Sequence, residues 1–360
     1  MNRFIIVAAA IVALAGLHGC ACQDVVEKAG LDQRPMEVME EKPERNMADG
    51  GALPVTTGGE GPVRPVADEE PVNIVEALGV HGVELNGTRA SAWFTILGRE
   101  TDFGERVRPD DLQLISEEEV LEVTVREVQP LTATKRKVAI MVVLANHENF
   151  DPVANGVVGS LRRLASALGP GDAIGLVHYG TEPGRPDRID IQSPASFEAA
   201  LGNLQPTRRA EPDPFAAIEV ATREFFSLEE PENFLRFVVV VGDGTSRWDS
   251  LPSRAKWQAR AVGSLGRASV VPILIGVGSD ATDDGYANYA EIAGQAHGVY
   301  THVADAEGLR VTLDGYAAQM LVSRVYEFNC KALSGGTEVT LRATLGDTVL
   351  ESKSLEVVQK

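Results

Sequence analysis

Seven consecutive apolar residues at positions 138–144 constrain this chain more than any other feature. The run reads Val-Ala-Ile-Met-Val-Val-Leu and contains no polar alternation. A strand without polar alternation is typical of a sheet that helices cover on both faces. A polar loop follows at 145–150, and Asp151-Pro152 then offers an N-cap and a first-turn proline for a helix. Ligands of open α/β sheets bind at the carboxyl ends of strands, so this loop is where a function is first sought.

The rest of the segment 135–322 alternates between strand and helix patterns. A second fully apolar run lies at 237–241. The apolar spacing predicts further strands at 173–179, 188–192, 270–277 and 299–303, and helices at 151–168, 194–204, 213–228, 254–268 and 285–297, with a last helix capped by Asp305. Alternation at these lengths predicts the fold class α/β, with a doubly wound, mostly parallel sheet that helices cover on both sides.

The segments on either side of this unit carry strand patterns only. Asn86-Gly87 separates two β-rich runs in the first segment, 72–132, which is a strong hairpin signal. The last segment, 323–360, has strand patterns at 324–332, 338–345 and 348–358. We predict that the two segments form one small accessory β-sandwich domain into which the α/β unit is inserted.

Residues 1–19 have the pattern of an export signal. One basic residue precedes an apolar run at 4–17 that is too short for a typical membrane span. The run ends in Leu17-His18-Gly19-Cys20, which resembles the lipobox of bacterial lipoprotein precursors. That resemblance implies lipidation of Cys20, and Ala21 in the next position implies the Gram-negative outer membrane. We therefore predict an outer-membrane lipoprotein of the cell envelope, and an ordinary secretory signal is the alternative.

The segment 20–71 is predicted to be a disordered acidic tether. Residues 23–70 hold 12 acidic and 5 basic side chains and few aromatic ones, so they cannot bury enough apolar area to offset the entropy of ordering. The whole chain has a net charge of −19, which argues against nucleic acid as a partner. Its three cysteines exclude a disulfide framework, and no Cys/His cluster indicates zinc.

Three segments of the central unit resemble the von Willebrand factor type A (VWA) domain. They are 168–177, where the family's first helix turns into its second strand, 275–280, and the closing helix and strand at 292–300. The resemblance implies a metal-ion-dependent adhesion site at the carboxyl end of the sheet. Such a site needs an Asp-x-Ser-x-Ser loop, a Thr and a further Asp, because Mg²⁺ requires hard oxygen ligands.

This chain departs from that metal-site pattern. The first loop reads Ala145-x-His147-x-Asn149, and the position of the Thr falls on Pro212. Only Asp243 matches. We therefore predict a degenerate adhesion site that holds no metal, and no other cofactor.

The same loops supply the candidate binding face, which consists of Asn146, His147, Glu148, Asn149, Asp213 and Asp243. The sequence has no nucleophile elbow, phosphate loop or His-Glu-x-x-His motif, so we predict that the protein is not an enzyme. The prediction is a lipid-anchored adhesion or scaffold module that binds a protein partner and reaches the membrane through Cys20. Two alternatives stay open: a metal-dependent adhesin with a noncanonical site, and a metal-assisted hydrolase that uses His147, Glu148 and Asp243.

Overall fold

The computed structural model of this 360-residue chain describes Ile74 and residues 76–98, 107–131, 134, 136–145, 151–179, 188–201, 212–278 and 283–360. They belong to one compact unit that begins at Ala67. The predicted signal peptide, Cys20 and the tether lie outside the described residues. So do four residues of the candidate binding face, Asn146, His147, Glu148 and Asn149.

The first sheet has six strands in the order β11-β10-β9-β6-β7-β8. Their bounds are β6 (Lys137–Ala145), β7 (Ala173–Tyr179), β8 (Arg188–Gln192), β9 (Phe234–Gly242), β10 (Val270–Val277) and β11 (Val299–Val303). The pairs from β11 to β7 are parallel, whereas β8 is antiparallel to β7 at the edge. The two fully apolar runs of the sequence thus form the adjacent central strands β6 and β9.

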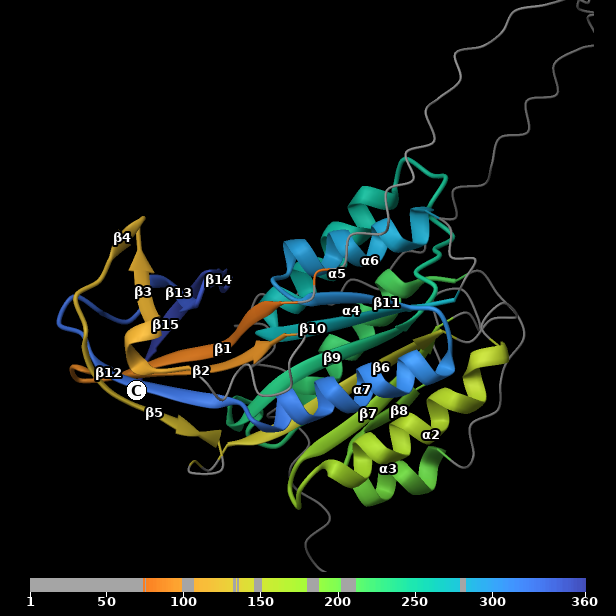
Figure 1. The fold of residues 1–360 in the computed structure, drawn as a ribbon, viewed down its shortest axis with the longest axis horizontal. Coiled ribbons are helices and arrows are strands. Elements are labelled where there is room, and N and C mark those ends of the chain that lie inside the picture. The colour runs from red at the N-terminus through yellow and green to blue at the C-terminus, as the bar shows by residue number, and fades with distance from the viewer. Residues whose placement is uncertain are drawn as a thin grey trace, which may run out of the picture. The chain divides into compact units, whose positions relative to one another are not determined.

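Six helices surround this sheet in the described part of the chain (Figure 1). They are α2 (Asp151–Ala167), α3 (Pro194–Leu201), α4 (Pro214–Glu224), α5 (Arg254–Arg267), α6 (Asp283–Gln295) and α7 (Ala306–Leu321). Helix α2 packs against α3 and α7, and α5 packs against α4 and α6. Figure 1 shows these two groups on the two sides of the sheet. This double covering explains why the run 138–144 of β6 and the run 237–241 of β9 contain no polar residue.

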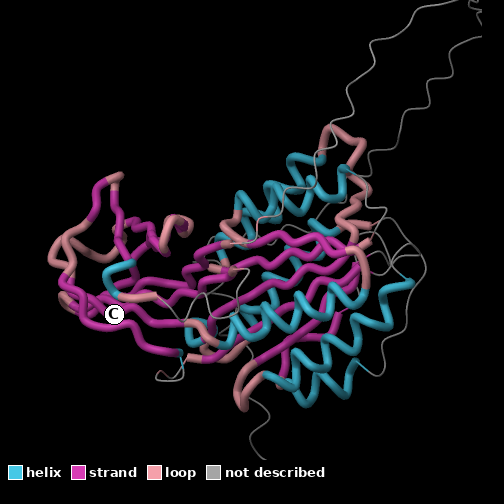
Figure 2. Tube along the Cα trace, viewed as in Figure 1, coloured by secondary structure: helices cyan, strands magenta, loops and turns pink. Residues whose placement is uncertain are grey.

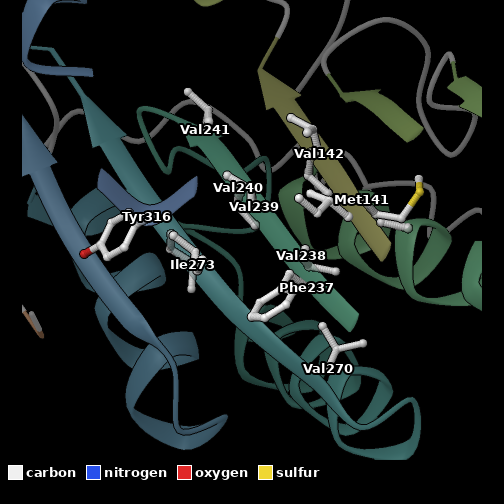
Figure 3. Packing of buried hydrophobic residues seen from close by; sticks show 14 of the residues in the cluster. Met141, Val142, Phe237, Val238, Val239, Val240, Val241, Val270, Ile273 and Tyr316 are labelled. Carbon is white, nitrogen blue, oxygen red and sulfur yellow. The ribbon is translucent and has the colours of Figure 1, made fainter. Parts of the chain in front are cut away.

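The centre of the core lies where β6 and β9 pair (Figure 3). All side chains from Val138 to Ala145 and from Phe237 to Val241 are buried. Burying one Val, Leu or Phe side chain contributes about 1.5–3 kcal/mol, so these two strands are a large part of what stabilises the sheet. The carboxyl ends of both strands are therefore held in fixed positions, and the candidate site is built on them.

The second sheet has nine strands, in the order β4-β3-β13-β15-β1-β2-β12-β5 with β14 also paired to β13. Their bounds are β1 (Ala77–Asn86), β2 (Arg89–Leu97), β3 (Leu112–Ser116), β4 (Glu119–Val120), β5 (Thr124–Pro130), β12 (Arg324–Asn329), β13 (Glu338–Leu345), β14 (Thr348–Glu351) and β15 (Leu355–Gln359). Strands from before and after the helical region pair here, since β12 lies between β2 and β5. Figure 2 shows the helices gathered around the first sheet, whereas this region consists of strands and loops apart from the 3-10 turn Pro109–Asp111.

The predicted fold class is wrong. The chain does not form a clear doubly wound, mostly parallel sheet with a small accessory β-sandwich, because both of its sheets are mixed and the second is a half-barrel. The antiparallel strand β8 makes the first sheet mixed, and the parallel pair β1–β15 does so in the second. Apolar alternation identifies strands but not their partners or directions, and β1 and β15 lie at opposite ends of the described chain. The division into domains stays a prediction.

A chain of buried hydrogen bonds joins the two sheets at His81. This residue lies at a register shift of the β1–β2 pair. Its Nδ1 accepts a hydrogen bond from the Arg236 backbone N–H at 3.2 Å, so Nε2 carries the proton and donates to Thr95 Oγ1 at 3.1 Å. The Thr95 hydroxyl is 2.6 Å from that of Ser323. Burial, together with the nearby charges of Lys353 and two arginines, holds the pKa of His81 well below its usual value, so the ring is neutral.

Candidate functional site

Two tyrosine hydroxyl groups meet at the carboxyl ends of β6, β7 and β9. Tyr179 ends β7 and Tyr289 comes from α6, and their hydroxyl oxygens are 2.8 Å apart. A Cβ placed on Gly242, the last residue of β9, would lie 2.2 Å from the Tyr179 oxygen and 2.8 Å from the Tyr289 oxygen. The same point is 2.8 Å from the Cβ of Ala145, which ends β6. The phenols therefore fill the space beside Ala145, where the metal-site pattern has its first carboxylate.

Both phenols are neutral at physiological pH. Burial raises the pKa of Tyr179 and of Tyr289 well above the usual value, and the nearby Asp243 carboxylate adds to the effect in each case. Tyr289 also forms hydrogen bonds with Tyr179 and with the Gly244 backbone, and these partly offset the rise in its pKa. The pair can therefore exchange hydrogen bonds, but it does not supply an anionic ligand or a general base near neutral pH.

Asp243 shapes the loop that follows β9. Its Oδ1 accepts hydrogen bonds from the backbone N–H of Thr245 at 3.1 Å and from the Thr245 hydroxyl at 2.9 Å. Gly244 has a φ of +74°, and a Cβ there would lie 2.0 Å from the carbonyl oxygen of Gly285 in α6. The Asn288 amide donates to the Gly244 carbonyl oxygen at 2.9 Å. These contacts fix the start of the loop against α6.

Asp213 is the buried anchor of the same loop. Its Oδ1 caps α4 by accepting from the Ala216 N–H at 3.0 Å, which is the standard N-cap interaction. Its Oδ2 accepts from the Arg247 guanidinium and from the Trp248 indole N–H, each at 3.1 Å. The Asp213 side chain is 8% exposed. Its two oxygens are therefore engaged within the protein.

An aromatic stack lies beside this anchor, and the sequence analysis missed it. The rings of Trp248 and Trp257 are stacked with centroids 5.0 Å apart. The guanidinium carbons of Arg247 and Arg260 lie 4.4 Å and 4.5 Å from the centroids of Trp248 and Trp257, respectively. Both indoles are partly buried against the core. The sequence offers one indication of this stack, because two of the three tryptophans of the chain lie within ten residues of each other, just after the second apolar run.

The structure thus brings two of the predicted site residues to one loop. Asp213 and Asp243 both bond to residues that directly follow β9, but each uses its carboxylate to hold that loop in place. Whether they share a face with residues 146–149 stays a prediction. In the part of the chain that the structure describes, no group of three or more His, Cys, Asp or Glu side chains is placed to hold a metal ion.

Comparison with known proteins adds no family to this description. No protein-family model matches the chain, and no curated protein matches it either. The lipoprotein signal and the VWA resemblance therefore stay predictions from the sequence. Among the described residues, no helix has both the length and the apolar character needed to cross a bilayer.

The tyrosine pair gives a prediction for the stability of the site. Tyr289→Phe should lower the free energy of unfolding by about 1 kcal/mol, since it leaves the buried Tyr179 hydroxyl without its partner. Tyr179→Phe should have a similar effect, and the double variant should cost clearly less than the sum of the two. Urea denaturation of the three variants and the parent gives this coupling. Strictly additive losses would contradict the pairing.

Proposed function

We propose that this protein is a protein-binding module of the cell envelope, an adhesion or scaffold component held at the outer membrane through Cys20. The observation that carries the proposal is the loop 243–253, which the contacts of Asp213, Asp243 and Asn288 fix in place. The loop carries Trp248, which stacks on Trp257 of α5, and Leu251, which is 45% exposed. Tryptophan and arginine are the residue types enriched at the energetic centres of protein interfaces.

Rigidity supports the proposal on energetic grounds. Ordering a rotamer-rich side chain on binding costs about 0.5–1.5 kcal/mol, and this cost is avoided when the side chain is already held. Trp248 is held by a hydrogen bond to Asp213 and by stacking on Trp257. A partner that packs against this loop would therefore bind with a smaller loss of side-chain conformational entropy than at a mobile loop.

Two alternatives from the sequence need other arrangements. A metal-dependent adhesin would need carboxylates that face an ion, whereas Asp213 bonds to Arg247 and Trp248. A metal-assisted hydrolase would need Asp243 to converge with His147 and Glu148, whereas Asp243 accepts two bonds from Thr245. A rise in melting temperature with millimolar Mg²⁺, Mn²⁺ or Ca²⁺ would favour the metal-dependent alternatives over the proposal.

Site-specific crosslinking tests the binding function. A photo-crosslinking amino acid replaces Leu251 in the full-length protein, in the cells that produce it, and Val311 serves as the control. Val311 is 58% exposed on α7. We expect a discrete covalent adduct from position 251 and none from position 311, with Trp248→Ala reducing the yield at 251. The same adducts from both positions, or none from either, would contradict the proposal.

The anchor has its own test. Cys20→Ser removes the thiol that would carry the acyl chains, so we expect the protein to move from the membrane fraction to the soluble fraction. Cell fractionation and metabolic labelling with a fatty acid measure this directly. The control is Cys22→Ser, which leaves the lipobox pattern unchanged. Equal membrane recovery of both variants would show that Cys20 is not the anchor.

A further inference from the structure

Helix α5 is basic, although the chain is strongly acidic. It carries Arg254, Lys256, Arg260 and Arg267 and no acidic residue, whereas the chain has a net charge of −19. Lys256, Arg260 and Arg267 are spaced by four and seven residues, which places them along one stripe of the helix. The stripe is roughly 16 Å long, because a helix rises 1.5 Å per residue.

Lys256 and Arg267 lie at the two ends of this stripe. Arg260 pairs with Glu219 of α4 at 3.0 Å, and Arg254 on the neighbouring turn lies 3.6 Å from Glu291 of α6. Lys256 and Arg267 are exposed and form no ion pair with any residue that the structure describes. A helix in an acidic protein that keeps two unpaired cations on one stripe has charge left for a partner.

The neighbouring indoles restrict which partners can bind. Each ring has the other indole against one face and a guanidinium near it, Arg247 beside Trp248 and Arg260 beside Trp257. The stacked indole and the guanidinium together cover much of the flat surface of each ring. Sugars and nucleobases bind tryptophan by stacking on a free ring face, and little free face remains here. The ring edges and Leu251 are left, and apolar protein side chains pack against such surfaces.

We propose that the exposed stripe of α5, together with Leu251, binds an acidic segment of a protein that also presents an apolar side chain. Carboxylates of the segment pair with Lys256 and Arg267, and its apolar side chain packs on Leu251 and the indole edges. This inference rests on the proposed binding function and names the chemistry of the partner. Physiological salt screens charges that lie farther away than about 8 Å. The negative charge of the rest of the chain therefore does not prevent an acidic segment from pairing with these two cations at short range.

Crosslinking followed by peptide sequencing tests the inference in the full-length protein, in the cells that produce it. The photo-crosslinking amino acid replaces Ala255, which is exposed in the first turn of α5 beside Lys256. We expect the crosslinked peptide to hold more Asp and Glu than Lys and Arg within ten residues of the crosslink. The double variant Lys256→Glu/Arg267→Glu should reduce the yield about tenfold, since it reverses two charge contacts.

The matched control is Arg89→Glu/Lys331→Glu, which makes the same change of net charge at two exposed sites, one in β2 and one in the segment that follows β12. It should change the yield less than twofold. A neutral or basic partner segment, an adduct with nucleic acid or glycan, or equal losses from the two double variants would overturn the inference. An adduct from position 251 but none from position 255 would also overturn the inference. That outcome would not contradict the proposed binding function. No adduct from either position would overturn both.

Discussion

Replacing Gly244 by alanine should lower the free energy of unfolding by about 4 kcal/mol, the largest effect we expect from a single methyl group in this protein. Gly244 has a φ of +74°, a conformation that residues with a Cβ adopt at a cost. The added Cβ would also lie 2.0 Å from the carbonyl oxygen and 2.6 Å from the carbonyl carbon of Gly285. Both contacts are with backbone, so no side-chain rotation can relieve them.

The same substitution should also reduce binding. The loop from Asp243 to Ser253 begins at this contact, and moving it away from α6 would displace Trp248 and Leu251. We therefore expect urea denaturation to show the loss of stability and the Leu251 crosslink to weaken. Gly266→Ala in α5 is the control, since a Cβ there meets nothing within 4 Å and alanine favours a helix by about 0.5–1 kcal/mol over glycine. A loss below about 1 kcal/mol at Gly244 would show that the contact with Gly285 relaxes freely.

Lys353→Met should raise the free energy of unfolding at pH 7 by about 3 kcal/mol, the second large effect. The Lys353 Nζ is buried and has no hydrogen-bond partner. Burial, followed by the nearby charge of Arg236, lowers the pKa of this lysine to about 8 in the folded protein, from 10.5. A shift of that size corresponds to about 3 kcal/mol of destabilisation below pH 8, where both folded and unfolded chains carry the charge.

The pH dependence separates this cause from better packing alone. Between pH 8 and 10.5 the folded protein releases the Lys353 proton before the unfolded chain does, so the parent gains stability as the pH rises. The difference between Lys353→Met and the parent should therefore shrink across this window. Urea denaturation at pH 7, 9 and 10.5 measures it, with Lys331→Met at an exposed site as the control. A difference that is the same at all three pH values would contradict the charge as the cause.

The sequence predicted local elements well where one pattern was strong. The apolar runs at 138–144 and 237–241 lie within β6 and β9, and the predicted helix 151–168 is α2. The predicted strand 348–358 instead divides into β14 and β15. Ser352 lies between them, and its hydroxyl accepts from the Leu341 N–H at 3.0 Å and donates to the Lys353 carbonyl. The Ser352 hydroxyl thus takes the place of a backbone group in a hydrogen bond between strands. The alternation of apolar and polar residues in the sequence does not indicate such a bond.

The candidate site was predictable in place but not in its contacts. The loop after β9 follows from the apolar run before it, and Asp243 stood out as the residue that matches a known pattern. Its bonds to Thr245 are local, since the two residues lie two positions apart. The bonds of Asp213 to a loop more than 30 residues later depend on tertiary structure. The Tyr179–Tyr289 pair spans 110 residues, and neither residue has a local signal.

The most direct test of the account is hydroxyl-radical footprinting of the full-length protein in its own membranes and after purification. If the loop after β9 and α5 form a partner-binding face, then Trp248, Leu251 and Trp257 should oxidise several-fold more slowly in the membranes than in the purified protein. Phe226 and Val311, exposed by 59% and 58%, should react equally in both samples. Equal oxidation of Trp248, Leu251 and Trp257 in the two samples would contradict the proposal that this face binds a partner.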